Sequence, residues 1–107
     1  MRPHYSDYMK HITRQYIALQ DTDEKLDDVT ENNVSAVRRV FSSLSEVEKE
    51  IIYKVYSYRV NDMQTGVADV ASETGMMQES IRSIMRVYER RLAEERGLIP
   101  CRERKDQ

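Results

Sequence analysis

Residues 67–92 constrain the fold of this chain more than any other stretch. Apolar side chains recur at helical spacing over residues 67–73, Gly75 follows, and a longer helical pattern covers about 77–96. Glycine ends a helix at positive φ without strain, and the small Ala71, four residues earlier, lets two helices cross closely. A short helix, a tight turn and a longer helix are typical of the helix-turn-helix motif, which the sequence therefore predicts here.

Helical spacing also covers most of the sequence before residue 67. The first expected helix spans about residues 7–20, with Ser6 as its N-cap, and a second begins near residue 34. A third starts at a capping box, in which Ser45 precedes Glu48 by three residues, and runs to about residue 58. Turn chemistry over 59–66 ends that helix. The side chains expected to face the core are Val37, Val40, Phe41, Leu44, Val47, Ile51, Ile52, Val55, Tyr56, Val67, Val70, Ala71, Ile81, Ile84, Tyr88 and Leu92.

The composition agrees with an all-α fold in the form of a small helical bundle. Only 3 glycines and 2 prolines occur, too few for the frequent turns of a β-sandwich. We expect residues 1–33 to form a helix and an acidic linker, residues 34–99 the helix-turn-helix domain, and residues 100–107 a disordered tail. The single cysteine, Cys101, excludes an intramolecular disulfide and fits a reducing cytoplasm.

Charge is distributed unevenly along the chain. The formal net charge is −2, yet residues 1–33 carry four basic and seven acidic side chains, whereas residues 75–107 carry eight basic and six acidic ones. This asymmetry weakly favours an anionic partner for the C-terminal third.

The last helix offers candidate contacts to duplex DNA. If its apolar stripe faces inward, the exposed positions near its start are Gln78, Glu79, Arg82, Ser83 and Arg86. Glutamine matches adenine, glutamate matches the cytosine amino group, and arginine matches guanine. Arg90 and Arg91 lie further along, where a helix leaving the groove meets phosphates. The alternative is a solvated face whose arginines pair with Glu89, Glu94 and Glu95.

The order and spacing of several motifs resemble sigma factor region 4, the domain that binds the promoter −35 element, and the short sigma-like transcriptional regulators of Gram-positive phages. The resemblance covers about residues 34–99. It is carried by Leu44-Ser-Glu-Val-Glu-Lys-Glu-Ile-Ile, Val55-Tyr56, Val67-Ala-Asp-Val-Ala, Gly75, Ser80-Ile-Arg-Ser-Ile and Arg90-Arg91-Leu92.

The resemblance implies four helices, of which the last two form the helix-turn-helix. By position it places base contacts on Gln78, Glu79, Arg82 and Ser83. Its phosphate contacts fall on Arg86, Arg90 and the start of the short helix near Gly66 and Val67. It also implies contact with RNA polymerase through the 37–56 face.

Residues 1–33 lie outside the resemblance. Tyr8, Ile12 and Tyr16 recur on one helical face and form a candidate docking surface for a host sigma factor or RNA polymerase. The alternative is that this stripe packs back on the bundle or joins two copies in a homodimer.

The expected function is therefore sequence-specific binding of double-stranded DNA in transcription control, by a phage or prophage protein in the cytoplasm of a bacterial host. A protein-interaction module that binds RNA polymerase or a sigma factor without DNA is the main alternative, favoured by Met77 at the start of the recognition helix and by a pI of about 5.7. The DNA-recognition domain of a packaging protein is a third reading. No enzyme, cofactor, metal site or membrane segment is expected, since His4, His11 and Cys101 complete no known ligand or catalytic pattern.

Overall fold

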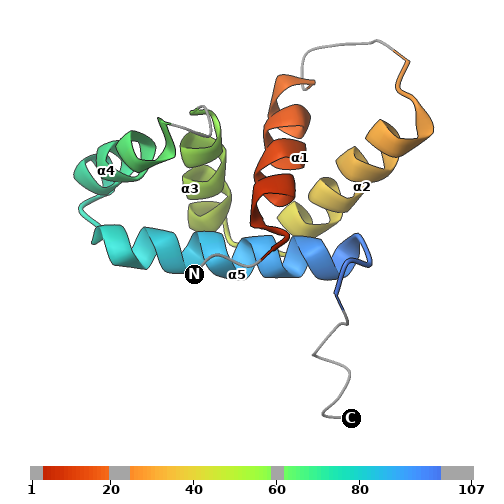
Figure 1. Cartoon of the computed structure of the whole chain (residues 1–107). Helices are drawn as coiled ribbons and strands as arrows, with labels where there is room; N and C mark the ends of the chain where they lie inside the picture. The colour runs from red at the N-terminus through yellow and green to blue at the C-terminus, as the bar shows by residue number, and fades with distance from the viewer. Residues whose placement is uncertain (1–3, 20–24, 59–61, 100–107) are drawn as a thin grey trace.

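The computed structural model describes residues 4–19, 25–58 and 62–99, and every regular element in these ranges is a helix, which confirms the all-α fold. The longest helix, α5, forms a base against which each of the other four packs (Figure 1). α4 lies over the N-terminal end of α5, while α1 and α3 stand on its middle (Figure 1). The helices are α1 (Ser6–Ala18), α2 (Asp28–Ser42), α3 (Glu46–Tyr56), α4 (Met63–Thr74) and α5 (Gln78–Glu95).

Two helix boundaries have the local chemistry predicted for them. Ser45 Oγ accepts from the Glu48 N–H at 3.2 Å, and Glu48 Oε1 accepts from the Ser45 N–H at 3.0 Å, so the capping box at the start of α3 is confirmed. Gly75 has φ 76° and its N–H donates to the Ala71 carbonyl, which ends α4 as predicted.

One hydrophobic core is shared by α1 to α5. α1 contributes Met9 and Ile12, both fully buried, so residues 6–18 are part of the bundle and not an appendage to it. The largest fully buried side chains are Tyr56, Tyr88, Met9, Ile12, Ile51, Ile52, Ile81, Leu92, Val37 and Val55. Most of the predicted core positions are confirmed, but Val47 is 61% exposed because it projects from the first turn of α3, beyond the edge of the core.

The predicted linker is too long, because α2 begins at Asp28 and not near residue 34. The Asp27 carboxylate accepts from the Thr30 N–H at 2.7 Å and thereby caps the helix. This hydrogen bond lowers the pKa of Asp27. Acidic residues read as a linker thus serve as the cap and first turn of α2, where the helix dipole favours negative charge.

Two further boundaries differ from prediction. Ser6 is not an N-cap; it is the first residue of α1 and is buried, whereas Tyr5 precedes the helix without a side-chain cap. α4 begins at Met63 and not at Val67. A Cβ atom at Gly66 would lie 2.7 Å from Cδ1 of the Tyr58 ring, so this glycine permits close packing on α4 and does not mark a turn. The expected tail and the first three residues of the 59–66 turn lie outside the described residues.

Candidate nucleic-acid interface

The N-terminal half of α5 carries the side chains predicted to read DNA. Ile81, Met85 and Tyr88 anchor this helix in the core, which turns its opposite side to solvent. Four of the predicted positions on that side are exposed, and Arg82 is half-buried. We call this side the arginine face; its members are Gln78, Glu79, Arg82, Ser83 and Arg86.

Both arginines of this face have partners on α5 itself. Arg82 Nη2 donates to Gln78 Oε1 at 3.1 Å. Arg86 Nη2 lies 2.8 Å from Glu79 Oε2, seven residues earlier. Hydrogen bonding and charge from Arg86 lower the pKa of Glu79. An exposed ion pair contributes only about 0–1 kcal/mol, so an incoming anion can displace it at small cost.

The residues predicted to contact phosphates differ in their exposure to solvent. Arg90 is half-buried, with Nε 3.4 Å from Glu94 Oε2, and Arg91 is half-buried as well. The prediction that Val67 marks a phosphate contact at the start of the short helix is wrong. Its side chain is buried, and because α4 starts four residues earlier its N–H falls within the hydrogen-bonded part of the helix.

The N-terminal stripe does not form the predicted docking surface. Ile12 is fully buried in the core, and the half-buried Tyr16 packs against Phe41 with ring centroids 5.4 Å apart. Tyr8 is partly exposed and its hydroxyl donates to Asn33 Oδ1 at 3.4 Å. The stripe packs back on the bundle, which was the alternative reading.

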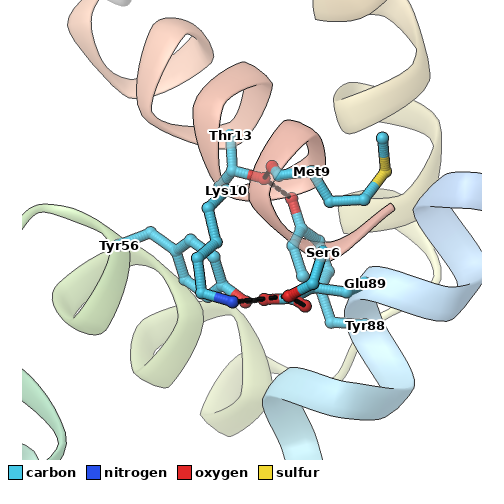
Figure 2. A network of polar contacts seen from close by, with 7 residues as sticks. All are labelled: Ser6, Met9, Lys10, Thr13, Tyr56, Tyr88 and Glu89. Carbon is cyan, nitrogen blue, oxygen red and sulfur yellow. Dashed lines mark hydrogen bonds and ion pairs between the residues drawn. The ribbon is translucent and has the colours of Figure 1, made fainter. Parts of the chain in front are cut away.

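A buried polar network, absent from the sequence predictions, joins α1 to α3 and α5 (Figure 2). Its centre is Glu89, which is buried and not exposed as in the alternative of a solvated, ion-paired face. Lys10 Nζ lies 3.1 Å from Glu89 Oε2 and donates to Ser6 Oγ at 2.6 Å, while Ser6 Oγ donates to Glu89 Oε1 at 2.6 Å. The Tyr56 hydroxyl donates to the same carboxylate.

A second branch of the buried polar network lies beside the first. Thr13 Oγ1 donates to the Met9 carbonyl at 2.8 Å and is 2.6 Å from the Tyr88 hydroxyl. Because the threonine proton is already used, the Tyr88 hydroxyl is the donor in the second bond. The Tyr56 and Tyr88 rings pack edge to face at 5.5 Å and connect the two branches. The sequence held a signal for this site, since Glu89 is spaced four residues after Met85 and three before Leu92, on the inward stripe.

We expect alkaline pH to destabilise the protein through the two buried tyrosines. Burial is the main cause that raises the pKa of both Tyr56 and Tyr88 well above 10, so the folded state holds their protons after the unfolded chain has lost them. Stability from this source is fully present below about pH 10 and falls above it by up to about 2.7 kcal/mol per pH unit for the pair. Urea unfolding at about pH 9 and about pH 11 measures this, and Tyr88→Phe should roughly halve the slope. Equal stability at both pH values would contradict it.

An apolar groove of about 500 Å³ lies between α3 and the aromatic residues of α1 and α2. Val47 and Tyr53 are exposed along it. Its lysines are paired: Lys49 lies 3.3 Å from Glu46, and Lys54 lies 3.1 Å from Glu50 and 2.6 Å from Glu73 of α4. The lining residues of the apolar groove are Tyr16, Phe41, Glu46, Val47, Lys49, Glu50, Tyr53 and Lys54.

Comparison with known proteins found no relative of this chain. No protein-family model matches the chain, and neither the curated proteins nor the solved structures include a match. Among the described residues, no helix has the length and apolar character needed to cross a membrane. Within the same ranges, no three His, Cys, Asp or Glu side chains gather as ligands for a metal ion.

Proposed function

We propose that this protein binds double-stranded DNA sequence-specifically through α5 and regulates transcription in the manner of sigma factor region 4. The observation that carries the proposal is the arginine face: Arg82 and Arg86 project from the first half of a helix whose other side is anchored in the core. α4 and the connection at Gly75 precede this helix, as in a helix-turn-helix. A phage or prophage origin and a place in the bacterial cytoplasm are part of the same proposal.

In this proposal the N-terminal half of α5 enters the major groove. Gln78, Glu79, Arg82 and Ser83 meet base edges, while Arg86 and the half-buried arginines beyond it approach phosphates. A single copy reads only a short half-site, so tight specific binding requires a second copy or a partner such as RNA polymerase or a sigma factor.

Fluorescence anisotropy across a salt series tests the proposal. The probes are a random-sequence duplex and a duplex enriched from a random library by the protein itself. We expect preference for the enriched duplex and affinity that falls with salt at a slope of about −0.9 per phosphate contacted. No binding to either duplex at about 50 mM salt would contradict DNA binding.

Replacing Arg82 with alanine should weaken binding to the enriched duplex by about 1–3 kcal/mol and relax selectivity at one base pair. The reason is the loss of paired donors to a guanine edge. Anisotropy against duplexes changed at single positions measures this effect. Lys49→Ala, which removes the same charge from α3, is the matched control and should leave the selectivity unchanged. A loss equal for all sequences would instead make Arg82 a phosphate contact.

The alternative function, a module that binds RNA polymerase or a sigma factor without DNA, is favoured by the apolar groove. Apart from Tyr16, the lining of the groove belongs to the 37–56 face for which the resemblance implies polymerase contact, and Val47 and Tyr53 are exposed there. Under this alternative, Val47→Asp should abolish binding to purified polymerase, while changes on the arginine face should not.

A further inference from the structure

Glu79 is the acidic member of the arginine face. Its carboxylate reaches along α5 to Arg86 at 2.8 Å, while Gln78 holds Arg82 at 3.1 Å. Both side chains of the ion pair are more than half exposed, at 66% for Glu79 and 58% for Arg86. The pair therefore stands on the surface that α5 presents to solvent, where DNA would approach.

We propose that Glu79 sets specificity by competing with DNA phosphate for Arg86. In the free protein its carboxylate holds the guanidinium along the helix, and it releases Arg86 fully only where the target offers the carboxylate another donor. This inference rests on the proposed function and assigns Glu79 a role in discriminating against wrong sequences as well as in reading the right one.

The physical basis is the charge balance of the pair. A carboxylate and a phosphate are both anionic acceptors for one guanidinium, so a phosphate that takes Arg86 leaves Glu79 without its partner and close to other phosphates. On a random sequence this arrangement is repulsive, which lowers the affinity. A cytosine amino group opposite Glu79 supplies the missing donor, so the same exchange becomes favourable at the right base pair.

The competing role predicts how Glu79→Gln changes binding. Without the carboxylate, Arg86 is free for a phosphate on any sequence. Affinity for a random-sequence duplex should rise about three- to tenfold between about 50 and about 200 mM salt, and the salt slope should steepen by about 0.9. Affinity for the enriched duplex should rise less, so the ratio between the two falls.

Glu46→Gln is the matched control for this experiment. It removes one negative charge from a side chain that is 91% exposed and paired with Lys49, but on α3. We expect its effect on random-sequence binding to stay below about twofold with an unchanged salt slope. Adding Arg86→Ala to Glu79→Gln should reverse the gain in affinity, because the released guanidinium is its source.

The outcomes separate this inference from the proposed function. If the wild-type protein binds DNA and Glu79→Gln behaves like Glu46→Gln, the competing role is overturned and DNA binding stands. If the wild-type protein binds neither duplex at about 50 mM salt, the proposed function fails and the competing role fails with it.

Discussion

Replacing Glu89 with glutamine is expected to lower the free energy of unfolding by about 3 kcal/mol. The side chain keeps its size but loses the charge that faces Lys10, and both side chains of this ion pair are about nine-tenths buried. The Lys10 ammonium would then lose the counter-charge that it has in Glu89. Leaving one member of a buried ion pair without its counter-charge costs more than the intact pair contributes, because the remaining charge still lacks water. Urea or thermal unfolding of the variant measures the loss.

The matched control removes both charges together. Lys10→Met with Glu89→Gln leaves no uncompensated charge, so the double variant should be more stable than Glu89→Gln alone. A double-mutant cycle with Lys10→Met then gives the coupling between the two sites. Loss of less than about 1 kcal/mol in Glu89→Gln would mean that the buried polar network does not hold α1 on the bundle through this charge pair.

Replacing Ile12 with alanine is expected to cost about 3 kcal/mol of unfolding free energy. Ile12 is fully buried in the core shared by all the helices, so its truncation removes apolar contacts and opens a cavity. If residues 1–33 were instead a separate appendage, the same change would leave the stability of the bundle almost intact. The loss of unfolding free energy in this variant therefore measures how much the packing of α1 stabilises the bundle.

Val47→Ala is the control for the Ile12 variant. Val47 is well exposed on α3, and substitutions at such positions usually change stability by less than about 0.5 kcal/mol. Chemical denaturation of the two variants side by side, with equal m-values, gives the comparison. Equal destabilisation by both changes would contradict the burial of α1.

Much of the fold followed from periodicity and local capping. The Ser45 capping box and the Gly75 helix end depend on interactions between residues a few positions apart, so the sequence alone predicts them. The predicted start of α4 is wrong because Gly66 is required by a tertiary contact and not by a turn. The glycine makes room for the Tyr58 ring. The predicted start of α2 is wrong because an aspartate is common both in linkers and at helix N-caps. Only its hydrogen bond with the Thr30 N–H identifies Asp27 as a cap.

The candidate site was predicted unevenly for the same reason. Exposure along the first half of α5 follows from the helical repeat, but the pairing of Arg86 with Glu79 was not predicted, although both residues lie on this helix. The buried polar network depends on contacts between residues far apart in sequence, with Ser6 and Glu89 separated by 83 positions. Helical spacing alone did not show that Ile12 faces the bundle and not a partner, since an amphipathic stripe looks alike in both cases.

DNA binding through α5 is the property on which the proposed function depends. Two-dimensional amide NMR of the 107-residue chain, titrated with the enriched duplex, tests it most directly. We expect chemical-shift changes to concentrate on residues 78–86, while amides lining the apolar groove, such as those of Val47 and Tyr53, stay unchanged. Changes centred on the groove, or none on α5 at saturating duplex, would contradict DNA binding through α5.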